Sequence, residues 1–342
     1  MARPKPQPVC LALQGGGAHG AFQWGVLDRL LEADLLDIRI VSAASAGAMN
    51  GAALISGLAR GGAEGGREAL DFLWREVNRS GGRNIFGDSG VWSRMLTPDW
   101  LKESFAWRAG ESFATTLSPY TFNPFNLNPL RRVVEASVDF DAVRNAAVEL
   151  IVSTTAVREG RSRLFRSGEI TPEVLLASAC LPHLFHAVEI EGEPYWDGGY
   201  LANPAIWPLT AREAPDDILL LPLNPFRRSE APRESGDIMD RLNEIMFNSP
   251  LVAELRSLAL VQDLISQGRL TPADASYQGT RLHAVEVDDW LGDLSMSTKF
   301  DTEWSFLSEL KTKGREAADQ WIQACADKLG KASSVDLTAR FL

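Results

Sequence analysis

Short apolar runs alternate with helical patterns over the first 65 residues of the chain. Residues 9–13 form a continuous apolar run that predicts a buried strand, and three glycines follow before apolar positions recur at helical spacing through Ala33. Residues 38–44 predict a second strand, and residues 46–58 predict a helix of small residues that ends near Gly61. Two successive strand, turn and helix units indicate an α/β protein with a mostly parallel sheet flanked by helices.

The pattern changes in character farther along the chain. Residues 84–126 hold nine aromatic residues in 43 positions, against 8% aromatic residues overall, and prolines and asparagines close the segment. This composition predicts a long irregular excursion over residues 84–130, which is either a lid or pocket wall or a small covered core. The other predicted elements are strands at 147–154, 218–223 and 282–287, a hairpin at 188–196 turning at Glu191–Gly192, and helices at 238–264 and 316–329.

Composition places the chain among folded globular proteins. With 45% hydrophobic and 23% charged residues in 342, neither a disordered chain nor a fibrous repeat is expected. Lysine and arginine number 34 against 45 acidic residues, which gives a net charge of −11. This charge argues against nucleic acid as a partner and against electrostatic attraction to an anionic membrane.

The cysteines and the N-terminal residues bear on the cellular compartment. Cys10, Cys180 and Cys325 are odd in number and lack the spacing of a zinc or redox motif, so we expect buried thiols in a reducing environment. The apolar residues 9–13 are too few for the core of a signal peptide, and no run approaches the ~18 apolar residues of a membrane helix. We therefore expect a cytoplasmic protein without a membrane span.

A glycine-rich loop, GGGAHG at residues 15–20, joins the first predicted strand to the first helix. The loop matches the GxGxxG pattern of dinucleotide-binding proteins, but that site needs an acid at the end of the second strand. Here that strand ends in residues 43–45 (AAS), and Asp34 and Asp37 precede it. Two other interpretations remain: a tight turn that begins a helix, or a loop whose backbone N–H groups stabilise an oxyanion.

The second strand-to-helix junction places Ser45 between Ala43 and Gly47, a near match to the G-x-S-x-G nucleophile elbow. Such a strained turn needs small neighbours to expose the serine hydroxyl, and the helix N-terminus then polarises it. Alone, a serine that caps a helix explains the pattern as well. Its combination with the glycine-rich loop favours a nucleophile.

A nucleophilic serine needs a base within hydrogen-bond reach. His283 would complete the order Ser…Asp…His, but an α/β-hydrolase nucleophile comes after several strands, and Ser45 follows only the second. Asp197 is the more specific candidate, because it ends the predicted hairpin and precedes Gly198 and Gly199, which let the backbone turn sharply. Either this is an ordinary Asp-Gly turn, or Asp197 reaches Ser45 and acts as its base.

These three motifs, in this order and over residues 9–208, resemble those of the patatin-like phospholipase family. The resemblance implies a three-layer α/β/α fold in which a Ser45–Asp197 dyad hydrolyses acyl esters of phospholipids or related lipids, without a metal or other cofactor. It implies that an oxyanion hole is formed at Gly15, Gly16, Gly17 and Ala46.

Ser45 and Asp197 are 152 positions apart and must meet in one site, so the first ~210 residues do not divide at the usual domain size. We expect an N-terminal tail at 1–8, a catalytic domain at 9–210, and a mainly helical extension at 211–342 packed on the same domain.

The sequence departs from the family pattern near the loop. Gln14 stands where many members have Asp, and His19 stands where many have Arg or Lys, so a cation near the loop is lost or depends on pH. His183 and His186 lie upstream of Asp197 and, with His19, are candidates for the wall of the pocket.

The partner implied by the resemblance is a phospholipid or another acyl-ester lipid. Because the chain is acidic, we expect any contact with a membrane or lipid surface to be peripheral, transient and apolar. Two other classes of function remain: a non-catalytic protein of the same fold that binds lipid or lipid granules, and a dinucleotide-dependent enzyme that uses the glycine-rich loop.

Overall fold

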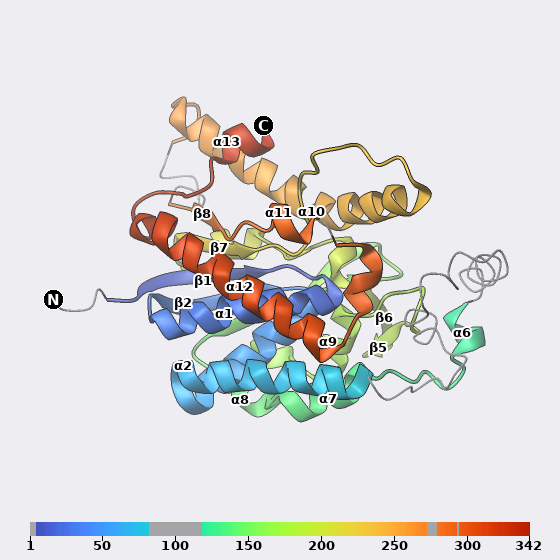
Figure 1. Cartoon of the computed structure of the whole chain (residues 1–342). Coiled ribbons are helices and arrows are strands. Elements are labelled where there is room, and N and C mark those ends of the chain that lie inside the picture. Colours follow the sequence, from blue (N-terminus) through green and yellow to red (C-terminus); the bar gives the residue numbers. More distant parts are fainter. Residues whose placement is uncertain (1–4, 82–117, 272–278, 293) are drawn as a thin grey trace.

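One sheet organises the chain, and helices cover both of its faces (Figure 1). The computed structural model describes residues 5–81, 118–271, 279–292 and 294–342. The strands of its eight-stranded sheet are β1 (Gln7–Leu13), β2 (Leu36–Ala43), β3 (Glu149–Ala156), β4 (Arg161–Arg166), β5 (Val188–Ile190), β6 (Glu193–Asp197), β7 (Asp217–Leu221) and β8 (Arg281–Ala284).

The strand order is β5-β6-β3-β2-β1-β7-β8, and β4 pairs with β3. The pairs β3–β2, β2–β1, β1–β7 and β7–β8 are parallel, whereas the pairs that involve β4, β5 and β6 are antiparallel. The prediction of an α/β fold with a mostly parallel sheet is confirmed. The two strands β7 and β8 of the C-terminal part extend this same sheet beyond β1.

The helices pack on the sheet in two layers. The described helices are α1 (Gly20–Ala33), α2 (Ala46–Gly81), α6 (Pro119–Phe122), α7 (Leu130–Ser137), α8 (Phe140–Asn145), α9 (Pro172–Ser178), α10 (Ser235–Ser266), α11 (Asp288–Leu291), α12 (Trp304–Cys325) and α13 (Leu337–Phe341). In Figure 1, α10 and α13 lie above the sheet, and α1 and α12 lie side by side in front of it. No described helix combines the length and the apolar composition that crossing a membrane requires.

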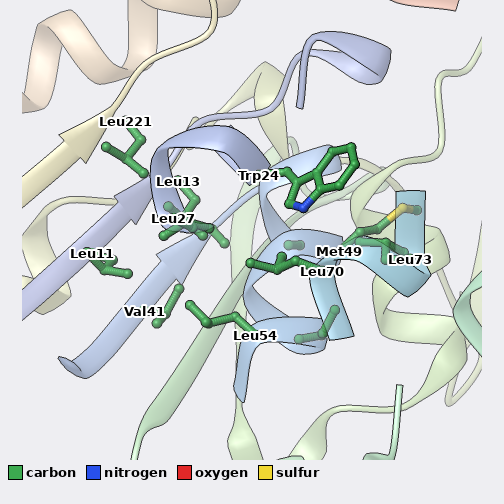
Figure 2. Packing of buried hydrophobic residues seen from close by; sticks show 14 of the residues in the cluster. Leu11, Leu13, Trp24, Leu27, Val41, Met49, Leu54, Leu70, Leu73 and Leu221 are labelled. Carbon is green, nitrogen blue, oxygen red and sulfur yellow. The ribbon is translucent and has the colours of Figure 1, made fainter. Parts of the chain in front are cut away.

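Both faces of the sheet are buried, which explains the continuous apolar runs of its parallel strands. Alternate residues of β1 enter different clusters: Leu11 and Leu13 pack with α1, α2 and α12, and Cys10 and Ala12 pack with α10 and α13. Figure 2 shows part of the larger cluster: Trp24 and Leu27 come from α1, Leu11, Leu13, Val41 and Leu221 from the strands, and Leu54, Leu70 and Leu73 from α2.

Most predicted elements are confirmed, and the differences have local causes. The helix predicted at 46–58 ends near Gly61 as expected, because Gly61 and Gly62 leave helical geometry, and a second helical segment then continues α2 to Gly81. The helix predicted at 316–329 begins earlier, as α12, because its first half packs closely on α1. The hairpin β5–β6 turns at Glu191–Gly192 as predicted, with both residues at positive φ.

Most of the predicted excursion at 84–130, namely residues 84–117, lies outside the described residues. Of its remainder, the structure describes the short helix α6 and the start of α7.

Candidate active site

The strands β2 and β6 pair with successive parts of the same edge of β3 and run toward each other. Because β4 occupies the other edge of β3, β2 and β6 share the remaining edge from opposite directions. The register pairs Ala43 with Val152 and Asp197 with Thr154, two residues farther along β3. The sheet thereby brings Asp197 next to Ser45, which follows β2 by two residues.

Ser45 lies in a strained turn between β2 and α2. Its φ of 52° is in the left-handed region, which non-glycine residues rarely occupy. The turn is tightly surrounded: a Cβ at Gly47 would lie 2.3 Å from the Leu13 carbonyl oxygen, and a Cβ at Gly15 would lie 2.7 Å from the Ser45 Cβ. The Ser45 N–H donates to the Ser178 Oγ at 2.8 Å, so a serine of α9 holds the turn in place.

Asp197 is the last residue of β6, and its carboxylate is buried with 1% exposure. Its Oδ1 accepts the N–H of Gly199 at 2.7 Å, and the Ser45 hydroxyl lies near enough to influence the pKa of the carboxylate. Burial raises the pKa of Asp197 to about 7, although the hydrogen bond from Gly199 and the Ser45 hydroxyl oppose this shift. The backbone is fixed as well, because the Asp197 N–H donates to the Cys180 carbonyl at 2.8 Å.

The glycine-rich loop packs directly against Ser45, and its N–H groups have different roles. The Gly15 N–H donates to the Asn203 Oδ1 at 2.8 Å and is therefore not free to bind an oxyanion. Gly15 is needed instead because a side chain there would collide with Ser45. Within the described chain, the N–H groups of Gly16, Gly17 and Ala46 donate to no protein acceptor. These three donors remain available for an oxyanion beside Ser45.

Gln14 forms the base of the loop. Its buried side chain accepts the N–H groups of Leu223 and Asn224 at 2.7 and 2.9 Å, and it donates to the Asn248 Oδ1 at 2.8 Å. Gln23 of α1 donates to the Gln14 carbonyl at 2.9 Å. The polar groups of this residue are therefore used to join the loop to the chain beyond residue 222 and to α10.

In the described chain, none of the four histidines forms a hydrogen bond with Ser45 or Asp197. The His19 Nε2 is 2.7 Å from the Thr298 Oγ1, and the His186 Nε2 is 3.2 Å from the Pro119 carbonyl oxygen. His183 is exposed. His283 is bonded to Asp217 at 2.9 Å, in a cluster with an arginine, so the order Ser…Asp…His is not assembled around Ser45.

Several residues that support the site carry no motif in the sequence. They are Ser178, which accepts the Ser45 N–H; Asn203, which accepts the Gly15 N–H; and Asn224, whose amide donates to the Gly15 carbonyl at 3.2 Å. Each is an isolated polar residue that only the folded chain brings near the loop. The position of Asn203, shortly after the Asp-Gly-Gly turn, is the one weak signal among them.

Other candidate sites are absent or lie elsewhere. Among the described residues, no three His, Cys, Asp or Glu side chains gather in a way that could hold a metal ion. A cavity of about 690 Å³ lies between the bend of α2 and Ser137, and another of about 270 Å³ is lined by leucines such as Leu27 and Leu58. Neither is lined by Ser45 or Asp197.

Comparison with known proteins gives one family match. A family model described as patatin-like phospholipase matches residues 11–210. A search of curated proteins found no match.

Among solved structures, the chain is similar to VipD from Legionella pneumophila, with 13% identity, a TM-score of 0.43, and coverage of 99% of this chain and 73% of VipD. It is also similar to the type III effector protein ExoU, with 17% identity, a TM-score of 0.31, and coverage of 94% of this chain and 53% of ExoU. The chain thus spans about half the length of ExoU.

Proposed function

Because the chain belongs to the patatin-like phospholipase family, a family of lipid ester hydrolases, we propose that it is a lipid acyl hydrolase with a Ser45–Asp197 dyad. The observation that carries this proposal is the placement of Ser45, on a strained turn after β2, beside the buried Asp197 carboxylate at the end of β6. Substrates are carboxylic esters of phospholipids or related lipids, as in a phospholipase A, a lysophospholipase or a carboxylesterase.

In the first half of the reaction, Asp197 takes the proton of Ser45 while the Ser45 Oγ attacks the ester carbonyl. The N–H groups of Gly16, Gly17 and Ala46 stabilise the negative oxygen of the tetrahedral intermediate. The ester C–O bond then breaks, Asp197 returns the proton to the departing alcohol or lysophospholipid, and the acyl group remains on Ser45.

In the second half, a water molecule takes the place of the alcohol. Asp197 accepts a proton from this water as it attacks the acyl-enzyme, and the same N–H groups stabilise the second intermediate. Ser45 regains its proton and the fatty acid leaves. One carboxylate serves both halves, because it is a base in each attack and an acid in each collapse.

The raised pKa of Asp197 suits this role. A base is most effective when its pKa lies near the working pH, and an ordinary aspartate is too weak a base for a serine hydroxyl. Burial raises the pKa of Asp197 to about 7, which supports its assignment as the general base. The proposal therefore includes a rate that falls as the pH drops below about 7.

Two substitutions test the dyad. We expect Ser45→Ala and Asp197→Asn each to lower kcat for a short-chain nitrophenyl ester by ~10³-fold or more, because each removes a reacting group. Ser137→Ala is the control, since this serine ends α7 and lines the cavity beside the bend of α2, which neither dyad residue lines. Full activity of either dyad variant would refute the proposal.

Covalent labelling distinguishes the proposed hydrolase from a non-catalytic protein of the same fold that binds lipid. A fluorophosphonate probe reacts only with an activated serine, so labelling of the wild-type protein that is lost in Ser45→Ala excludes a protein that merely binds lipid. A folded wild-type protein that never becomes labelled favours that alternative. Thermal stabilisation by a dinucleotide in a protein without esterase activity would instead favour the dinucleotide-dependent enzyme.

We also propose that the first half of α10 contacts the lipid surface from which substrate is taken. Large apolar side chains are exposed along this half at helical spacing: Ile238, Met239, Leu242, Ile245 and Met246. The stripe is close to the dyad, because a Cβ at Gly199 would lie 2.7 Å from the ring of Phe247. The net charge of −11 supports an apolar rather than an electrostatic attraction.

Flotation with phosphatidylcholine vesicles tests this contact. We expect the double variant Leu242→Asp/Ile245→Asp to lose vesicle binding and to keep hydrolysis of a soluble ester, because only the exposed stripe changes. Leu260→Asp is the control, since Leu260 is also exposed, at 49%, but lies in the second half of the same helix. Equal binding by both variants would contradict the contact.

The proposed setting is the cytoplasm, without nucleic acid as a partner. Cys10, Cys180 and Cys325 are free thiols, and burial raises the pKa of Cys10 and Cys180 to about 12, which keeps both unreactive. Free cysteines are typical of a reducing compartment.

A further inference from the structure

The glycine-rich loop is held by a short segment from the far end of the chain. This segment is the 3₁₀ turn η7 (Met296–Phe300), which lies outside the range 11–210 matched by the family model. It approaches the loop closely, because a Cβ at Gly17, where φ is 60°, would lie 2.3 Å from the Lys299 carbonyl oxygen. Only glycine fits at this position.

A second contact joins His19 to Thr298. The Thr298 hydroxyl donates its single proton to the Ser295 carbonyl at 2.6 Å, so in the 2.7 Å contact the His19 Nε2 is the donor. Burial, with Lys299 nearby, lowers the pKa of His19 to about 3. His19 is therefore neutral near pH 7 and supplies no positive charge to the loop.

A third contact runs from Lys299 through Asn224 to Gly15. The Lys299 ammonium donates to the Asn224 Oδ1 at 2.6 Å, and the Asn224 Nδ2 donates to the Gly15 carbonyl at 3.2 Å. An ammonium can only donate, so it fixes which side of the Asn224 amide faces it and which side faces Gly15. This cation beside the loop thus comes from η7 and not from the loop itself.

We propose that Lys299 is a positioning residue for the oxyanion loop, acting through Asn224 to fix the backbone that presents the free N–H groups of Gly16 and Gly17. This inference rests on the proposed function, because it assigns a role within that site. It also assigns a role to the extension beyond residue 210, which completes the site rather than merely covering it.

The charge of Lys299 depends on its surroundings. Glu244 and Asp240 of α10 face the ammonium and favour its charged form, Arg228 opposes it, and the Phe247 ring lies 5.9 Å away. Burial is the largest effect and lowers the pKa of Lys299 to about 8. Lys299 is therefore mainly charged at pH 7 and loses its proton above pH 8, where its bond to Asn224 weakens.

Kinetics of Lys299→Met, with Lys313→Met as control, test the proposal. A displacement of ~1 Å at a catalytic group costs up to ~100-fold in rate, so we expect kcat to fall 10- to 100-fold with little change in KM. Lys313 is a surface lysine of α12 paired with Glu316, and its loss should leave kcat unchanged. Lys299→Arg should restore most of the rate.

The pH profile separates positioning from a merely structural role. In the wild type, kcat should decline above about pH 8 as Lys299 loses its proton. Lys299→Arg should lack this alkaline decline, because arginine stays charged, and should keep the acidic decline caused by Asp197. An unchanged alkaline decline in Lys299→Arg would overturn the proposal, as would full activity in Lys299→Met.

Hydrogen exchange provides a readout that does not need turnover. The amides of residues 14–20 should exchange faster in Lys299→Met and in Thr298→Val than in the wild type or Lys313→Met, with no change in other segments. Unaltered exchange in the loop would overturn the proposal. If Ser45→Ala were as active as the wild type, the dyad would fail, and loop exchange would still decide the role of Lys299.

Discussion

At the scale of single residues, Asp197 combines its proposed role as the catalytic base with a cost in stability. A carboxylate whose pKa is raised on folding, from 3.8 to about 7, binds its proton more tightly in the folded chain. Between these two pH values the unfolded state holds fewer protons, so stability falls as the pH rises through this window. Above about pH 7 the full cost of the buried charge is present.

Asp197→Asn should therefore stabilise the protein while abolishing its activity. The amide oxygen can still accept the Gly199 N–H, and no charge is buried. We expect the Tm of the variant to exceed that of the wild type at pH 8 by several degrees, at ~2–4 °C for each kcal/mol, and by much less at pH 5. Thermal unfolding at both pH values measures this. An equal Tm difference between variant and wild type at pH 5 and pH 8 would show that the charge of Asp197 does not cause the stabilisation.

The sequence identifies the residues proposed to react but not those that hold them. Ser45 and Asp197 stand in short motifs, because a nucleophile elbow and a sharp turn each need small neighbours adjacent in the chain. Asn203, Asn224 and Lys299 act through hydrogen bonds over separations of up to 209 positions, as between Gly15 and Asn224. Such contacts need only one polar side chain at the right point in space, and they leave no local pattern.

At the scale of elements, continuous apolar runs identified the parallel strands because those strands are buried on both faces. The strand β4 was missed because its residues, RSRLFR, are mostly exposed and polar, and only its pairing with β3 makes it a strand. The first half of α12 was missed for a different reason. Its Gly314 looks like a break, yet it lets α12 approach α1 so closely that a Cβ there would lie 2.0 Å from the Phe22 carbonyl oxygen.

The bend in α2 provides a test with a built-in control. Gly62 has a φ of 61° and a ψ of −148°, a region that side chains essentially exclude, whereas Gly61 has a φ of −146°. A Cβ at either glycine meets nothing within 4 Å. We expect Gly62→Ala to lower the free energy of unfolding by ~1–3 kcal/mol through backbone strain alone. Gly61→Ala should change it little.

Urea denaturation of both variants measures the difference, and labelling of Ser45 reports whether the effect reaches the site. Because Ser45 precedes the first segment of α2 and the bend follows it, labelling should stay intact in both. Equal stability of the two variants would mean that Gly62 does not adopt the positive φ described for the bend.

At the scale of the whole molecule, the boundary of the family match and the boundary of the fold differ. The match ends at residue 210, yet the sheet continues through β7 and β8, and β7 pairs with the central strand β1. Leu219 and Leu221 of β7 belong to the same core cluster as Leu11 and Leu13. The glycine-rich loop also depends on groups beyond the boundary, since Gln14 accepts the N–H groups of Leu223 and Asn224.

We therefore expect a chain of residues 1–210 to fail to fold alone. Without β7, the central strand β1 would become an exposed edge strand of the remaining sheet. Helix α1 would also lose α12, the helix on which it packs most extensively. The truncated chain should show no cooperative thermal transition and no labelling by a fluorophosphonate, whereas co-expression of residues 211–342 should restore both. A cooperative, labelled 1–210 chain would instead make the extension a separate unit, and would leave Lys299 without a necessary part in the site.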